Sequence, residues 1–158
     1  MTGFWRCAIY AIALGLAAIP LGRLLARHRF NTAAFPWKDR KWERGGTVYR
    51  KIGIHRWHNH LPDMSRVLKN IMPPKALHPG ITPGELDEMI QETCVAECSH
   101  ACLSALGLVL LPLWPGWGGV IFCLLYILLG NFPFILIQRF NRPKLIQLHA
   151  RVSKRSLL

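Results

Sequence analysis

Three apolar stretches alternate with polar, basic segments along the 158 residues of the chain. The first lies within about residues 4–25, the second belongs to a predicted helix over about 83–113, and the third covers about 118–140. An α-helix of about 20 apolar residues is long enough to cross the hydrocarbon core of a bilayer. The pattern therefore predicts an all-α integral membrane protein with about three transmembrane helices, an N-terminal anchor followed by a C-terminal helical hairpin.

Polar segments connect and follow these helices. We expect a single membrane domain over residues 1–158, in which residues 26–82 form an interfacial and linker segment and residues 141–158 a basic tail. The linker ends in "ITPGE", where Thr82 is a predicted N-cap, Pro83 the first helical residue and Glu85 the partner of Thr82 in a capping box. The helix from Pro83 should run unbroken into the membrane.

The composition combines apolar character with a large positive charge. Hydrophobic residues make up 51% of the chain, the mean hydropathy is +0.22, and 20 Lys and Arg against 8 acidic residues give a net charge of +12. Such a charge favours an anionic neighbour, either nucleic acid or the cytoplasmic face of a bilayer. Because the apolar helices favour the bilayer, we expect membrane lipid and no nucleic acid as partner.

Aromatic residues are interleaved with cations in the middle segment. They are Phe35, Trp37, Trp42, Tyr49 and Trp57. This arrangement occurs in proteins that bind single-stranded nucleic acid, and also at membrane surfaces, where rings lie at headgroup depth and cations meet lipid phosphates. Beside membrane helices, we favour an amphipathic segment at the membrane surface.

The distribution of charge predicts the orientation. Thirteen Lys or Arg lie between Arg23 and Thr93 and six between Arg139 and Leu158, whereas the turn between the second and third helices has none. By the positive-inside rule, the middle segment and the tail are cytoplasmic in a multi-pass protein of the cell membrane, with the N-terminus outside. The first helix runs into arginines without a small-residue cleavage site, which favours a retained anchor over a signal peptide.

Three ionisable residues share one face of the second predicted membrane helix. At about 100° per residue, Glu97 and His100 lie about 60° apart, with Glu92 about 80° to the other side of His100. Ionisable groups at membrane depth are costly and usually functional. We predict that Glu97 and His100 are catalytic and that Glu92 binds substrate. The alternative is a buried pair of Glu97 and His100 that only fixes helix packing.

The third helix carries polar residues at two levels. Asn131 lies at the depth of His100, and Pro133 frees a backbone carbonyl there, so Asn131 either lines a cavity shared with His100 or satisfies that defect. Arg139, Asn141 and Arg142 follow at the cytoplasmic boundary. Such cations anchor a helix in the interface, but below a cavity they are also suited to an anionic group such as a nucleotide phosphate.

Cysteines and further histidines suggest little additional chemistry. The five cysteines lie in or beside apolar stretches and predict no disulfide framework, and Cys94, Cys98 and Cys102 form one stripe of small packing residues. His58 and Asp63 fit the H-x-x-x-x-D arrangement of some histidine-dependent acyltransferases, a pattern short enough to arise by chance. We expect no metal site.

Two stretches resemble a known family. "ETCVAECSH" (residues 92–100) and "NFPFILIQRFNRPKL" (residues 131–145) are similar to the motifs of the glycosyl-4,4'-diaponeurosporenoate acyltransferases of staphyloxanthin-type carotenoid biosynthesis. Phe140 stands in place of the family's Tyr, and Lys144 in place of a frequent Arg. The matching positions are Glu92, Thr93, Ala96, Glu97, His100, Asn131, Pro133, Gln138, Arg139, Asn141, Arg142, Pro143 and Leu145.

The resemblance extends over about residues 35–155 and includes Trp57 and Asp63, two further candidates for substrate binding. It implies a membrane O-acyltransferase that moves a fatty acyl group from acyl-CoA to a hydroxyl of a glycosylated carotenoid or similar glycolipid, with no further cofactor. Its partners would be the acyl donor, a glycosylated isoprenoid or glycolipid acceptor, and other pathway enzymes. A non-catalytic membrane scaffold or lipid-binding subunit is the alternative.

On this hypothesis the predicted residues have separate roles. His100, polarised by Glu97, is the general base, and the amide of Asn131 receives the oxyanion. The donor phosphates are expected to bind Arg139 and Arg142, with Glu92 and Asn141 orienting them or the sugar.

Overall fold

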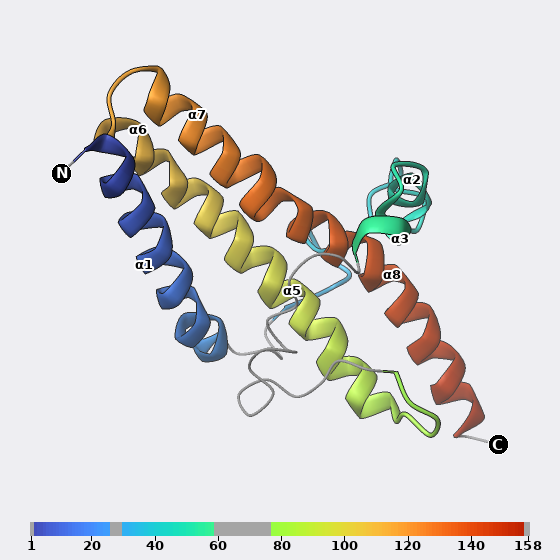
Figure 1. Cartoon of the computed structure of the whole chain (residues 1–158). Coiled ribbons are helices and arrows are strands. Elements are labelled where there is room, and N and C mark those ends of the chain that lie inside the picture. The colour runs from blue at the N-terminus through green and yellow to red at the C-terminus, as the bar shows by residue number, and fades with distance from the viewer. Residues whose placement is uncertain (1, 26–29, 59–76, 157–158) are drawn as a thin grey trace. The chain divides into compact units, whose positions relative to one another are not determined.

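The computed structural model describes residues 2–25, 30–58 and 77–156, and every regular element in these ranges is a helix (Figure 1). Gly3–Gly22, Pro83–Leu113 and Trp117–Arg155 are long and apolar enough to cross a membrane. The predictions of an all-α fold and of three such helices are confirmed. The elements are α1 (Gly3–Leu24), α2 (Thr47–Lys51), α3 (Ile54–Trp57), α5 (Pro83–Leu106), η3 (Gly107–Val109), α6 (Leu110–Leu113), α7 (Trp117–Leu125), η4 (Tyr126–Asn131) and α8 (Phe132–Arg155).

The chain divides into two compact units. Unit 1 consists of Met1–Arg29 and Cys94–Gln138, and unit 2 of Phe30–Thr93 and Arg139–Leu158. Helices α5 and α8 each contribute residues to both units. The expectation of a single membrane domain stays a prediction.

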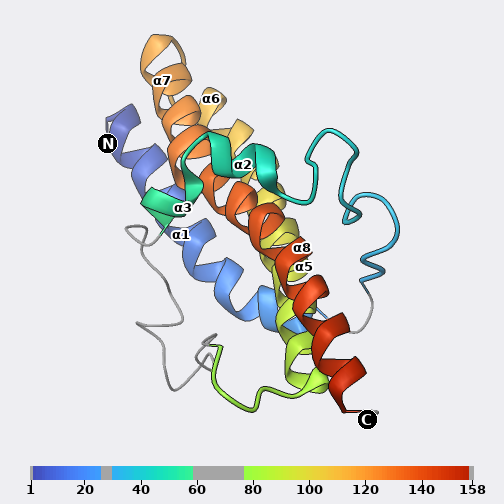
Figure 2. The same ribbon diagram turned by 90° about the vertical axis from the view of Figure 1, so that its right-hand side faces the viewer.

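Unit 1 is a helical bundle in which α1 packs against both α6 and α7 (Figures 1 and 2). Its buried centre is small: the thiol of Cys7 lies 3.6 Å from the carbonyl oxygen of Leu110, and Cys123 is buried beside them. At the start of α1, the Phe4 ring meets Trp114 in the turn between α6 and α7, with ring centroids 6.3 Å apart. The N-terminus of α1 and this turn therefore lie at the same end of unit 1.

The outer surface of unit 1 is apolar. Exposed side chains include Ile12, Leu16, Leu125 and Leu129, the last being 65% exposed. Exposed apolar residues spread over several helices are costly in water and suit a hydrocarbon surrounding. This exposed apolar surface is consistent with three helices that are long and apolar enough to cross a membrane.

The start of α5 follows the predicted capping box. The Thr82 backbone N–H donates to the Glu85 carboxylate (2.8 Å), and the Glu85 N–H donates to the Thr82 hydroxyl (3.3 Å). The first helical residue is Pro83, whose missing N–H costs nothing at this position. The predicted start of the second long helix is confirmed.

Helix α8 is longer than the sequence suggested, because it continues to Arg155 and not only to about residue 140. Pro143 removes one backbone hydrogen bond in its interior. The residues beyond it keep a helical spacing of partly buried apolar side chains, Leu145, Leu148 and Val152. This apolar face carries the helix through the segment predicted as a basic tail.

In unit 2, the backbone of Gly46 approaches α8 closely. Gly46 has φ +85°, and a Cβ at this position would lie 3.2 Å from the carbonyl oxygen of Phe140. Gly53 has a similar φ of +77°, but a Cβ there would meet nothing within 4 Å. The two glycines therefore separate the effect of backbone conformation from that of crowding.

Gly46→Ala is expected to destabilise the protein more than Gly53→Ala. Both variants lose about 1–2 kcal/mol because an L residue is strained in the left-handed region. Only Gly46→Ala also displaces the backbone of α8. Thermal unfolding of the detergent-purified variants measures the difference, and an equal fall in Tm for both would contradict the close approach of Gly46 to Phe140.

Candidate active site

Unit 1 brings together two of the predicted catalytic residues, His100 of α5 and Asn131 at the end of η4. Nδ1 of His100 lies 3.0 Å from Oδ1 of Asn131. Because an amide oxygen only accepts, Nδ1 carries the hydrogen and donates it. In the neutral imidazole the other ring nitrogen, Nε2, then holds a lone pair, which is the form that a general base requires.

Asn131 is itself fixed by the backbone. It is only 2% exposed, and its Nδ2 donates to the carbonyl oxygen of Tyr126 (3.0 Å). Tyr126–Asn131 is a π-helical turn that ends two residues before Pro133, and such turns leave backbone groups outside the α-helical pattern. Asn131 thus satisfies a backbone carbonyl and faces His100 at the same time.

The imidazole of His100 is also held by packing. Its ring stacks on Phe134, with centroids 4.7 Å apart and an interplanar angle of 8°. The hydroxyl of Ser104 donates to the His100 carbonyl oxygen (2.8 Å). Glu97 is buried one helical turn earlier on α5. The ring orientation is therefore set by Asn131 and Phe134, with a buried carboxylate on the same helix.

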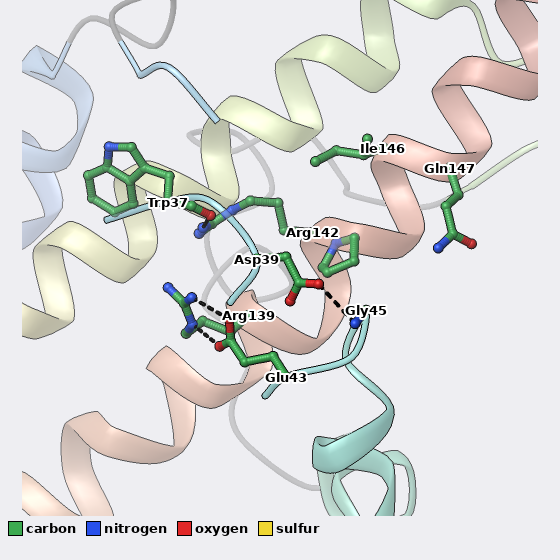
Figure 3. A pocket seen from close by; sticks show the side chains of 9 residues that line it. Trp37, Asp39, Glu43, Gly45, Arg139, Arg142, Ile146 and Gln147 are labelled. Atoms are coloured by element: carbon green, nitrogen blue, oxygen red, sulfur yellow. Dashed lines mark hydrogen bonds and ion pairs between the residues drawn. The ribbon is translucent and has the colours of Figure 1, made fainter. Parts of the chain in front are cut away.

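In unit 2, Arg139 of α8 forms an ion pair with Glu43 (Figure 3). Nε of Arg139 donates to one carboxylate oxygen and Nη2 to the other, the second contact measuring 2.6 Å. Nη1 and Nη2 also donate to the carbonyl oxygens of Pro36 (3.0 Å) and Lys38 (3.2 Å). This guanidinium ties the loop before α2 to α8.

Glu43 is a buried carboxylate, only 1% exposed. Burial acts to raise its pKa, but hydrogen bonds from Arg139 and Tyr49 outweigh this effect and lower the pKa from 4.5 to about 2. Burial and the neighbouring carboxylate raise the pKa of Tyr49, so its phenol stays protonated and donates to Glu43. Glu43 is therefore charged and fully paired at neutral pH.

Arg142 makes a second connection of this kind. Its Nε donates to the hydroxyl of Thr93 (2.8 Å), Nη2 to the Thr93 carbonyl (3.2 Å) and Nη1 to the Trp37 carbonyl (2.9 Å). The guanidinium also lies 5.6 Å from the centroid of the Trp37 ring, and Arg142 is 2% exposed. Arg142 thus joins α5, α8 and the loop within unit 2.

The other predicted substrate-binding residues belong to unit 2, whereas His100 and Asn131 belong to unit 1. Glu92 is buried on α5, Asn141 is partly buried on α8, and Trp57 ends α3, all in unit 2. Asp63 lies outside the described residues. His58, its partner in the H-x-x-x-x-D pattern, donates from Nδ1 to the Ile54 carbonyl (2.8 Å).

Sequence reasoning missed Glu43. It is one of two carboxylates in residues 30–58, the other being Asp39. A lone carboxylate in "KWERGG", between cations and next to a pair of glycines, is a signal that could have identified a buried ion pair. Its partner could not be identified, because Arg139 lies 96 residues away.

The structure defines an all-helical protein with three helices long and apolar enough to cross a membrane and with His100 hydrogen-bonded to Asn131. Residues 30–151 match the family described as glycosyl-4,4'-diaponeurosporenoate acyltransferase, and the chain belongs to this family. The proteins of that name from Staphylococcus aureus strains are 29% identical over 150 residues, covering 94% of this chain and 88% of each relative. No solved structure matches.

The family prediction is thereby confirmed, and the protein is an acyltransferase. The names of the relatives give no support to the alternative hypothesis of a non-catalytic membrane scaffold.

Proposed function

We propose that the protein is an integral membrane enzyme that transfers a fatty acyl group from acyl-CoA to a hydroxyl of a glycosylated carotenoid acid. The name of the relatives supports the acceptor, a glycosyl-4,4'-diaponeurosporenoate. The observation that carries the mechanism is the hydrogen bond between Nδ1 of His100 and Oδ1 of Asn131. It leaves Nε2 of His100 ready to accept a proton.

The reaction needs one base and no cofactor beyond the acyl donor. Nε2 of His100 removes the proton from a sugar hydroxyl as the oxygen attacks the thioester carbonyl carbon. The C–S bond of the tetrahedral intermediate then breaks, and the leaving thiolate takes the proton back from the imidazolium. The products are an ester and a free thiol, and His100 returns to its starting state.

Asn131 and Glu97 support this base in different ways. Both ends of the Asn131 amide are engaged, by His100 and by Tyr126, which favours a positioning role over oxyanion binding. We assign Glu97, which is buried one helical turn earlier on α5, the role of stabilising the imidazolium through its negative charge.

The two arginines of the family motif act as structural clamps in this proposal. Arg139 and Arg142 donate to protein groups that already surround them. We propose that the donor phosphates instead meet exposed cations of the middle segment, which include Lys38, Arg40, Lys41, Arg44 and Arg50.

The middle segment also suits a cytoplasmic membrane surface. Phe35, Trp42 and Ile52 are 82%, 53% and 55% exposed among these cations. Exposed rings and cations together are typical of segments that bind anionic headgroups. In unit 1, the N-terminus of α1 lies at the same end as the turn between α6 and α7, and this turn lacks Lys and Arg. By the positive-inside rule, this supports a multi-pass protein of the cell membrane with its basic segments on the cytoplasmic side.

Lipid extraction tests the acceptor. Cells that make the glycosylated carotenoid acid are compared with and without the protein, and their pigments are analysed by mass spectrometry. We expect an ester-linked acyl chain on the pigment only when the protein is present. An acyl chain that is equally abundant in both extracts would contradict the proposed acceptor.

A further inference from the structure

Two cations of unit 2, Arg50 and Lys144, lie close together. Arg50 is in the last turn of α2 and Lys144 is on α8, and they are near enough for their like charges to repel each other. Both side chains are exposed. Within the described ranges, neither side chain forms an ion pair with a carboxylate or donates a hydrogen bond to the protein. An anion between the two cations would be attracted by both and would relieve their repulsion.

The fold of unit 2 holds this pair in place through Phe140, a ring that is 3% exposed. Gly46 at the start of α2 approaches the backbone of Phe140, and the centroid of the His58 ring, directly after α3, lies 6.2 Å from that of Phe140. The ammonium of Lys144, one turn further along α8, lies 2.9 Å from the same centroid. This cation–π contact positions Lys144 against the helix that carries Arg50 without neutralising its charge.

The pair differs from the arginines of the family motif. Arg139 and Arg142 donate to protein oxygens that already surround them. The segments that carry the pair, residues 45–58 and 139–158, contain no Asp or Glu that could act as a counter-charge. Two neighbouring cations without a carboxylate are suited to a phosphate group, whose oxygens accept charge-assisted hydrogen bonds from both.

Apolar side chains beside the pair favour a lipid phosphate over a soluble one. Ile52, two residues after Arg50, is 55% exposed, and Trp42 in the loop before α2 is 53% exposed. A nucleotide has no alkyl chain to cover such groups, whereas an anionic lipid presents a phosphate directly above hydrocarbon. The predicted cytoplasmic boundary of α8 also lies just before Lys144, at the depth of lipid phosphates.

We propose that Arg50 and Lys144 bind the phosphate of an anionic membrane lipid in the cytoplasmic leaflet. The guanidinium and the ammonium donate to the phosphate oxygens, and the acyl chains enter the bilayer beside the exposed apolar groups. The inference rests on the proposed function for the membrane location of the protein. All the residues that carry it belong to unit 2, and it leaves the other exposed cations of the middle segment for the donor phosphates.

Lipid titration followed by native mass spectrometry tests the proposal without acyl transfer. The full-length protein in detergent is titrated with phosphatidylglycerol, which is anionic, or with phosphatidylcholine, whose headgroup is neutral overall, and the first bound lipid gives a Kd. We expect phosphatidylglycerol to bind the wild type at least about 10-fold more tightly. Arg50→Gln and Lys144→Gln should each raise the Kd for phosphatidylglycerol about 5-fold, the effect of one cation near a membrane surface.

Lys154→Gln is the matched control, because it removes one positive charge from an exposed position further along α8. It should leave the Kd for phosphatidylglycerol nearly unchanged. Adenosine 3',5'-bisphosphate, which carries phosphates but no acyl chain, is titrated in the same way to distinguish a lipid from a soluble phosphate. Its binding should not weaken in Arg50→Gln or Lys144→Gln. A thermal melt of each variant shows that it is folded.

Three results would overturn the lipid site. They are equal affinity of the wild type for the two lipids, an equal rise in Kd in Lys154→Gln, and binding of adenosine 3',5'-bisphosphate that weakens in Arg50→Gln and Lys144→Gln while lipid binding does not. If phosphatidylglycerol is not preferred but the purified protein still acylates the acceptor, the lipid site fails and the proposed function stands. If phosphatidylglycerol binds as expected and no acylation occurs, the proposed function fails instead.

Discussion

His100→Ala is expected to lower kcat about 100- to 10,000-fold, the usual contribution of a general base. The substitution removes the nitrogen that accepts the hydroxyl proton and leaves the backbone of α5 unchanged. The KM values for donor and acceptor should therefore change much less than kcat. Initial rates of acyl transfer by purified protein in proteoliposomes measure both parameters.

A matched control is His78→Ala, which removes an exposed histidine outside the three helices that are apolar enough to cross a membrane. It should keep the wild-type kcat. Thermal unfolding of both variants shows whether they are folded. A folded His100→Ala variant with wild-type kcat would remove His100 from the mechanism.

Glu43→Gln is expected to lower the free energy of unfolding by about 3–5 kcal/mol, because it leaves the guanidinium of Arg139 buried without its counter-charge. The lowered pKa of Glu43 corresponds to a loss of free energy of similar size. A fall from 4.5 to about 2 corresponds to about 3 kcal/mol at 1.36 kcal/mol per pKa unit. Glu88→Gln, an exposed change on α5, should have almost no effect. Thermal and denaturant unfolding in detergent at pH 7 measure the loss.

The pH dependence has a defined direction. Because the folded-state pKa of Glu43 is lowered, its contribution is complete above about pH 4.5 and is lost as the pH falls towards 2. The difference in stability between the wild type and Glu43→Gln should therefore shrink on acidification through this range. A difference that stays constant from pH 7 to pH 3 would show that the pair contributes nothing through its charge.

The long helices could be predicted from sequence because local signals agree. Hydrophobicity marks each run, and Thr82, Pro83 and Glu85 define the start of α5 by a mechanism confined to neighbouring residues. The end of α8 was harder to predict. Pro143 and the cations after it indicate a tail, but the partly buried Leu145 and Leu148 keep the helix intact.

Depth along two predicted helices placed His100 and Asn131 at the same level, and the structure gives them a hydrogen bond. The direction of that bond could not be predicted, because it depends on the π-helical turn that presents the Tyr126 carbonyl to Asn131. Arg139 and Arg142 were recognised as part of a motif, and their predicted role in phosphate binding stays a prediction, but their contacts within the protein were not foreseen. Their partners, Glu43, Thr93 and the loop carbonyls, are distant in sequence and depend on how the loop folds back within unit 2.

Acyl transfer by the purified protein tests the central claim most directly. Wild type and His100→Ala are reconstituted side by side with acyl-CoA and the glycosylated carotenoid acid, and ester and free CoA are quantified by mass spectrometry. We predict one free CoA for each ester formed by the wild type, and at least about 100-fold less of both with His100→Ala. Absence of the ester with the wild type, or equal amounts from the two proteins, would contradict the account.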